Sequence, residues 1–330
     1  MPSPCTIKEL NWYDFPSLML DNGLVRMVVV PALGAKIVSL CKISKNGSAR
    51  EWLFKSPRQE PRLPDFDQKY TEEDNLGLWD ECFPSVSPTH YPNGPWKGSA
   101  VPDHGELWCQ PWKEKKKGNE EELELRTVTY GVRFPYRFER VIRMRRGSPT
   151  IEFFYNCHNL SIFPFNFIWC PQPVFEAKPG MQIVLPAQEM TVYNSANDEF
   201  GQLGTRQLWP SVQTNDDHYY DLSVFPSRDA EIALKMYGRS PTQGFVALKD
   251  PSTDSELAME FDYNEITHIA LALNFGAWPG KPGQANHYYA MIAPCIGLLD
   301  DLALAVNHYE EYGQIAPKDL RTWRLRITLS

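Results

Sequence analysis

Apolar and polar residues alternate with a period of two along many short segments of this chain. The last of them, TWRLRITL, would place its apolar residues on one side and its arginines on the other. This alternation is typical of a half-buried β-strand. Turn signals recur about every ten to fifteen residues, and the 28 prolines limit long helices. We therefore predict an all-β, antiparallel sandwich or barrel, with two strands flanking a turn at 31–34 within 25–37, and further strands at 123–129, 137–144, 151–155, 183–185, 231–236, 244–248, 256–262, 267–274 and 322–329.

Residues 299–312 are the exception, because apolar side chains recur there every three or four positions. This spacing predicts a helix. Asp300 or Asp301 is expected to cap its first turn, and Gly313 and Pro317 to end it. Few other short helices are expected.

Composition excludes several classes of protein. The formal net charge of −8 argues against a nucleic-acid partner. The seven cysteines form no CxxC pair, which favours reduced thiols in a cytoplasmic protein. No secretory signal or membrane span is recognisable. The charged run 113–124 is interpreted as a hairpin tip. With no domain boundary visible, residues 1–330 are predicted to be one domain, a monomer or homodimer.

Residues 57–112 lack periodicity and concentrate the residue types of proton transfer. The segment GLWDECFPSVSP contributes Asp80 and Glu81, and PDHGELWCQPW contributes His104 and Glu106. A histidine can gain or lose a proton near neutral pH, and a carboxylate can be its partner. No phosphate loop, HExxH or GxSxG motif is present. The sequence therefore favours acid–base chemistry without a metal or cofactor.

Pro102 and Gly105 favour a turn or a strand end at PDHGELW, and we expect a strand end at a cleft wall. On a strand, His104 and Glu106 would share one face and Asp103 would point to the other. Trp108 and Trp278 are expected to line the cleft, because aromatic rings pack on sugar rings as well as in cores. Arg133, Arg137 and Arg140 are the basic residues nearest to this region.

Five segments in order resemble the galactose mutarotase-like superfamily, with the aldose 1-epimerase-related branch the most similar. They are GLWDECFPSVSP, PDHGELWCQPW, NLSIFPFNFIWCPQPVFEAKPGMQIVLP, NHYYAMIAPCIGLLDDLALAV and TWRLRITL, and LMLDNGLVRMVVVPALGAKIVSL fits the opening strands. The resemblance implies a β-supersandwich with a sugar cleft on one sheet. It also implies interconversion of sugar anomers by a histidine and a glutamate, with a second histidine assisting and no cofactor.

Carried over residue by residue, the resemblance implies an altered site. The assisting histidine matches His104. Gln172 stands in WCPQPVF where the acid histidine is expected, and Ala293 stands in IAPC where the base glutamate is expected. Neither replacement can transfer a proton near neutral pH. Each such group contributes typically 10²–10⁴-fold, so mutarotation of free glucose and galactose is expected to be slow.

Three functions remain open at this point. The first is an isomerase of a sugar or sugar-like lactol with a rebuilt acid–base pair. The second is a non-catalytic carbohydrate-binding protein, and the third is a different cyclisation, isomerisation or elimination on a non-sugar substrate. The candidate catalytic residues are His104, Glu106 and Glu81. The candidate residues for binding a carbohydrate-like small molecule are Asp80, Trp108, Gln172, Trp278 and Arg140.

Overall fold

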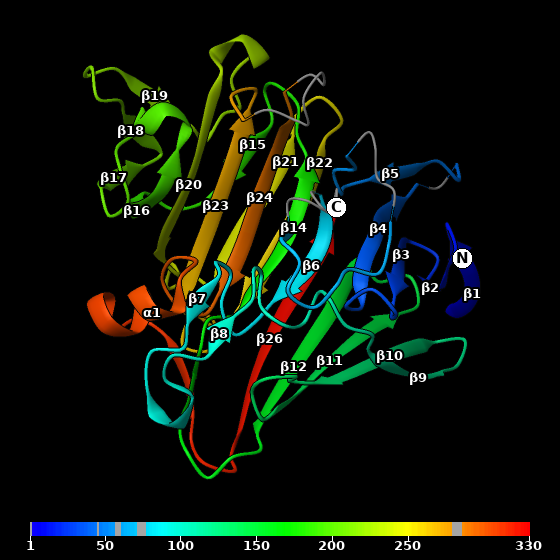
Figure 1. Ribbon diagram of the computed structural model, residues 1–330. Helices are drawn as coiled ribbons and strands as arrows, with labels where there is room; N and C mark the ends of the chain where they lie inside the picture. Colours follow the sequence, from blue (N-terminus) through cyan, green and yellow to red (C-terminus); the bar gives the residue numbers. More distant parts are fainter. Residues whose placement is uncertain (1, 45, 57–60, 71–76, 279–285) are drawn as a thin grey trace.

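The computed structural model describes residues 2–44, 46–56, 61–70, 77–278 and 286–330, and it consists mainly of two antiparallel sheets (Figure 1). Strands account for 53% of this structure and helices for 6%. The larger sheet has twelve strands, in the order β1 (Thr6–Trp12), β2 (Phe15–Asp21), β3 (Val25–Val30), β4 (Lys36–Ile43), β6 (Leu78–Cys82), β14 (Cys170–Glu176), β24 (Tyr288–Cys295), β23 (His268–Phe275), β20 (Ile232–Arg239), β16 (Gln188–Ser195) and β17 (Arg206–Trp209), with β5 (Ala49–Glu51) paired to β4.

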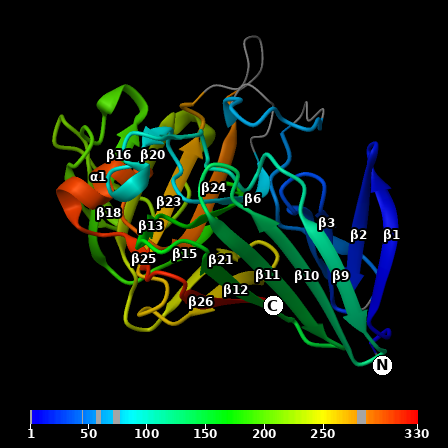
Figure 2. The same ribbon diagram turned by 60° about the horizontal axis from the view of Figure 1, so that its bottom comes forward.

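The smaller sheet has eight strands and packs against one face of the larger one. Its order is β15 (Gln182–Val184), β21 (Phe245–Asp250), β22 (Ser255–Phe261), β26 (Leu320–Leu329), β12 (Thr150–Asn159), β11 (Tyr136–Arg145), β10 (Glu122–Tyr130) and β9 (Lys113–Gly118). Figure 2 shows β9 beside β1 and β2, where the edges of the two sheets meet. Three short pairs complete the strands: β7 (Thr89–His90) with β8 (Ala100–Val101), β13 (Phe165–Phe167) with β25 (Gly313–Ile315), and β18 (Ser211–Gln213) with β19 (Tyr219–Asp221).

Alternation determines which side chains form the core between the sheets. In β26, Trp323 and Ile327 are fully buried, whereas Arg324 and Arg326 are exposed. Burying one large apolar side chain stabilises the fold by about 1.5–3 kcal/mol. The strands predicted from alternation are all present, as is the hairpin of β9 and β10. The prediction of a β-supersandwich is therefore confirmed.

Two predictions of secondary structure were wrong or incomplete. The helix is shorter than 299–312: one α-helical turn, α1 (Leu302–Leu304), continues as a π-helical stretch, Ala305–Tyr309. Residues 57–112 were read as aperiodic, yet they contain β6 in the middle of the large sheet. All five residues of β6 are buried, so this strand shows no alternation that a sequence reading could detect. Among the described residues, no helix is long and apolar enough to cross a membrane.

Candidate functional site

One row of side chains crosses five neighbouring strands of the large sheet. Asp80 of β6 lies opposite Gln172 of β14, Ala293 of β24 lies opposite Ala270 of β23, and Ala270 lies opposite Tyr237 of β20. The pairing between β14 and β24 keeps one register over its length, and this register places Gln172 opposite Ala293. Directly opposite residues of antiparallel strands point to the same side. We call this side of the large sheet the site face.

The site face has small side chains at its centre and charged groups at both ends. The next row along the strands places Ala272 opposite both Met291 and Lys235. Three alanines and Met291 therefore occupy the middle strands, while a lysine, an aspartate and a tyrosine gather on each side. Adjacent strands are about 4.8 Å apart, so the row from Asp80 to Tyr237 spans about 19 Å.

The first group, the Asp80 cluster, consists of Lys36, Tyr70 and Asp80. The Lys36 ammonium and the Tyr70 hydroxyl both donate to Oδ2 of Asp80, the latter at 2.7 Å. Burial, followed by the charge of Asp80, raises the pKa of the Tyr70 hydroxyl well above its usual value. Tyr70 therefore stays protonated and donates to the carboxylate at ordinary pH.

His104 extends the Asp80 cluster toward the loops. Its Nδ1 lies 2.7 Å from Oδ1 of Asp103, and its ring stacks on Tyr70 with centroids 3.9 Å apart and planes 8° apart. Burial alone would raise the pKa of Asp103, but the hydrogen bond and the charge of His104 outweigh burial and lower it. Asp103 is thus an anion that can stabilise a protonated imidazole. The Trp108 indole supports this group by donating to the Asp103 carbonyl at 2.8 Å.

The prediction of a strand at PDHGELW was wrong. The segment is a turn, and His104 has a φ of 59°, a left-handed conformation in which histidine occurs more often than most residues. The turn directs Asp103 toward His104. Glu106, expected beside His104, is instead fully buried and accepts hydrogen bonds from the backbone amides of Val132 and Arg133. It fixes the loop between β10 and β11, and burial raises its pKa.

Glu81 and Arg140 lie between the two sheets and away from the site face. Because strand side chains alternate, Glu81 points to the opposite side from Asp80. Its carboxylate pairs with Arg140 at 3.0 Å and accepts from Tyr155 and Trp169, and both charged side chains are 0% exposed. Their partners are interior groups, so the structure separates these two predicted site residues from the others.

The second group, the Asp300 cluster, consists of Lys235, Tyr237 and Asp300. Lys235 donates to Asp300 at 2.7 Å, and the Tyr237 hydroxyl also donates to it. Burial would lower the pKa of Lys235, but the charge of Asp300 outweighs burial and raises it. The lysine is therefore an ammonium ion.

Sequence reasoning left Asp300 as a possible helix cap and missed its place on the site face. Asp301 is the cap, because its carboxylate accepts from the backbone amides of Ala303 and Leu304. The available signal was the pair of adjacent acids, since one carboxylate suffices for a cap and leaves the other free for another role.

A backbone connection fixes the separation of His104 and Asp300. The amide of Val86 donates to the carbonyl of Asp300 at 2.9 Å, and the amide of His104 donates to the carbonyl of Val86 at 2.6 Å. Two backbone hydrogen bonds thus link His104 to Asp300 through Val86.

Trp278 lies in the loop after β23 and is half-buried. Its backbone amide and carbonyl both bond to the side chain of Asn274. Asn274 is four residues along β23 from Ala270, which corresponds to about 13 Å. Trp278 therefore belongs to the far end of the sheet rather than to the row through Gln172.

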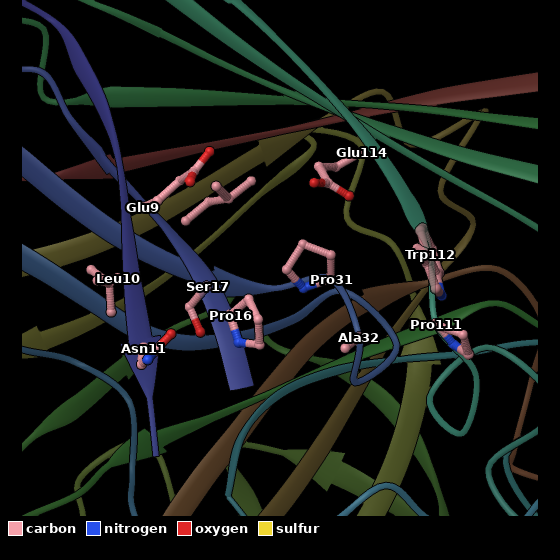
Figure 3. A pocket seen from close by; sticks show the side chains of 11 residues that line it. Glu9, Leu10, Asn11, Pro16, Ser17, Pro31, Ala32, Pro111, Trp112 and Glu114 are labelled. Carbon is pink, nitrogen blue, oxygen red and sulfur yellow. The ribbon is translucent and has the colours of Figure 1, made fainter. Parts of the chain in front are cut away.

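A cavity of about 630 Å³ lies elsewhere, between β1, β2, the turn after β3 and the start of β9 (Figure 3). Its walls include Leu10, Pro31 and Trp112, and Glu9 and Glu114 lie at one side. None of the residues nominated from the sequence lines it. Across the described ranges of the chain, no group of histidines, cysteines and acids is arranged to hold a metal ion.

Comparison with solved structures identifies the fold. No protein-family model matches the sequence, and no protein of curated function matches it. A galactose mutarotase-like protein from Clostridium acetobutylicum superposes with a TM-score of 0.67 at 12% identity, covering 99% of both chains. A candidate aldose 1-epimerase from Escherichia coli gives 0.64 at 14% identity, also covering 99% of both. A galactose mutarotase related enzyme from Lactobacillus acidophilus gives 0.61 at 14%, covering 95% of this chain and 97% of the other.

These structures share an architecture with the present chain over nearly their full lengths. The fold is therefore a galactose mutarotase-like sandwich, which the resemblance of the five sequence segments implied. At 12–14% identity the likeness concerns the fold, and the chemistry has to be argued from the residues of this chain.

Proposed function

We propose that this protein is an isomerase of the aldose 1-epimerase type, acting on the cyclic hemiacetal of a sugar or sugar-like lactol. His104 and Asp300 replace the acid and base that Gln172 and Ala293 cannot provide. One observation carries the proposal: two backbone hydrogen bonds link His104 to Asp300 through Val86, so a histidine–aspartate pair and a second carboxylate lie on neighbouring segments.

The reaction needs only proton transfers. The Asp300 carboxylate takes the proton from the anomeric hydroxyl, and protonated His104 gives a proton to the ring oxygen. The bond between the anomeric carbon and the ring oxygen breaks as the carbonyl forms. After rotation about one bond the steps reverse, and the ring closes as the other anomer. Asp103 stabilises the imidazolium form of His104, and Lys235 and Tyr237 hold Asp300 in place.

The charges around the site favour a ligand without phosphate. Lys36 and Lys235 are each paired with an aspartate. Of the arginines nominated from the sequence, Arg133 bonds Asp67 at 2.7 Å, Arg137 bonds Glu139 at 2.5 Å, and Arg140 is buried against Glu81. A phosphate would have to compete with these carboxylates for its partners. An uncharged ring needs no such exchange.

Anomeric exchange measured by proton NMR on a panel of reducing pentoses, hexoses and deoxysugars tests the proposal. We expect at least one sugar to interconvert well above the buffer rate. Interconversion of free glucose and galactose is expected to be slow, because His104 and Asp300 lie at the ends of the row from Asp80 to Tyr237 rather than at its centre. Binding of a sugar without acceleration would support a non-catalytic carbohydrate-binding protein instead. If no sugar of the panel binds and none is accelerated, a redirected reaction on a non-sugar substrate is favoured.

A further inference from the structure

Tyr70 makes three different contacts with the His104 side of the site. Its ring stacks face to face on the imidazole of His104. Its backbone amide donates to Oδ2 of Asp103 at 3.0 Å, and its hydroxyl donates to Oδ2 of Asp80. Trp108 packs edge-on against the same ring, with centroids 5.1 Å apart. One residue therefore connects the strand carboxylate, the loop carboxylate and the histidine.

We propose that Tyr70 is a positioning residue that fixes the ring plane of His104 and ties it to the large sheet. This inference rests on the proposed role of His104 in proton transfer. Asp103 alone holds only one ring nitrogen and leaves the imidazole free to swing about that bond. A flat neighbour at 3.9 Å restricts this motion, and the hydroxyl anchors that neighbour to Asp80 on β6, which belongs to a rigid element.

Tyr70 lies outside every segment that carries the family resemblance. It stands in the irregular part of the chain, ten residues before Asp80. Nothing in the spacing or composition there marks a tyrosine as special. Its role emerges only because the chain folds back and places Tyr70 between Asp80 and His104.

Two substitutions separate the contacts of Tyr70. Tyr70→Phe keeps the stacked ring and the backbone hydrogen bond but removes the hydroxyl. Tyr70→Leu also removes the ring, and Tyr263→Leu in an exposed turn serves as the matched control. A misplacement of about 1 Å in a catalytic group can cost about 10²-fold. We therefore expect Tyr70→Leu to lower kcat by about 10²-fold with little change in KM. Tyr70→Phe keeps the ring but loses its anchor to Asp80, so it should lower kcat by a smaller factor, and Tyr263→Leu should have no effect.

A second readout is independent of turnover. The ring current of Tyr70 shifts the His104 ring protons upfield in NMR spectra, and His104→Ala identifies those signals among the seven histidines. We expect the signals to move downfield and broaden in Tyr70→Leu but not in Tyr70→Phe. If Tyr70 had only a structural role, Tyr70→Leu would lower the amount of folded protein. The folded fraction would not show the lower kcat at unchanged KM that a positioning role predicts.

The outcomes distinguish this inference from the proposed function. If the wild type interconverts a sugar and Tyr70→Leu retains its kcat, the positioning role is wrong while the function stands. If the wild type accelerates no sugar, the proposed function fails and the NMR spectra decide: unchanged His104 signals in Tyr70→Leu overturn the positioning role, and displaced, broadened signals support it.

Discussion

The two sides of the site face use the same three residue types in opposite arrangements. In the Asp80 cluster, strands supply the lysine and the aspartate, and an irregular segment supplies Tyr70. In the Asp300 cluster, β20 supplies both Lys235 and Tyr237, and the segment before α1 supplies the aspartate. The carboxylate is thus part of the sheet on one side and part of a connecting segment on the other.

The two carboxylates, Asp80 and Asp300, therefore have different roles. Asp80 is fixed in the row and holds Tyr70, which in turn stacks on His104. Asp300 comes from the segment before α1, and its carboxylate accepts from Lys235 and Tyr237 of β20. In the proposed function, Asp80 therefore acts through other residues, whereas Asp300 acts on the ligand.

Glu81, the neighbour of Asp80 on β6, provides the largest expected effect on stability. Glu81→Gln leaves the Arg140 charge unpaired in the interior, and breaking a buried ion pair in this way costs about 3–5 kcal/mol. We expect urea unfolding to show a loss of this size. Glu124→Gln, which removes a partly exposed partner of Arg143, should cost under about 1 kcal/mol. Equal losses in both variants would mean that Glu81 is not in a buried pair.

A double-mutant cycle compares the two lysine–aspartate pairs. Lys36 and Asp80 are 5% and 2% exposed, and Lys235 and Asp300 are 11% and 7% exposed. With Lys→Met and Asp→Asn variants, we expect coupling energies of about 0.5–3 kcal/mol for both pairs. The surface pair Arg206–Glu189 should couple more weakly. A negligible coupling for Lys235–Asp300 would contradict the idea that Lys235 holds the carboxylate in place.

The two sides should also respond to opposite changes of pH. The lowered pKa of Asp103 gives stability that is present above its unfolded value and is lost as the pH falls toward the folded one. The raised pKa of Lys235 gives stability that is present below its unfolded value and is lost as the pH rises through the folded one. We expect Asp103→Asn to flatten the acid limb of the unfolding free energy and Lys235→Met to flatten the alkaline limb. If Asp103→Asn flattened the alkaline limb and Lys235→Met the acid limb, the two groups would not respond to pH in the proposed way.

The smallest expected effect is that of ligand charge on binding affinity. Because the described lysines and arginines near the site are already paired, a sugar 6-phosphate should bind more weakly than the same sugar without phosphate. Phosphorus NMR line widths of the sugar phosphate, titrated with protein, measure this directly. Tighter binding of the phosphate would show that one of these ion pairs opens to accept it.

Much of the fold could be predicted from the sequence because half-buried strands alternate. Trp323 and Ile327 of β26 show this pattern plainly. The central strand β6 does not, because both of its faces are buried, and so the sequence could not tell that Asp80 faces the site and Glu81 the interior. The turn at His104 places a histidine in the left-handed region directly before Gly105, and Tyr70 reaches the site only through tertiary packing.

The most direct test of the account is the rate of anomeric interconversion by Asp300→Asn, measured by polarimetry or NMR on the sugar that the wild type accelerates most. Asparagine keeps the shape and one of the two acceptor oxygens that Lys235 and Tyr237 bind, but it cannot take a proton. We expect kcat to fall by about 10²–10⁴-fold with KM changed only a few-fold, and Asp301→Asn, at the neighbouring helix cap, to leave the rate intact. An Asp300→Asn protein that is folded and as fast as the wild type would contradict the central claim.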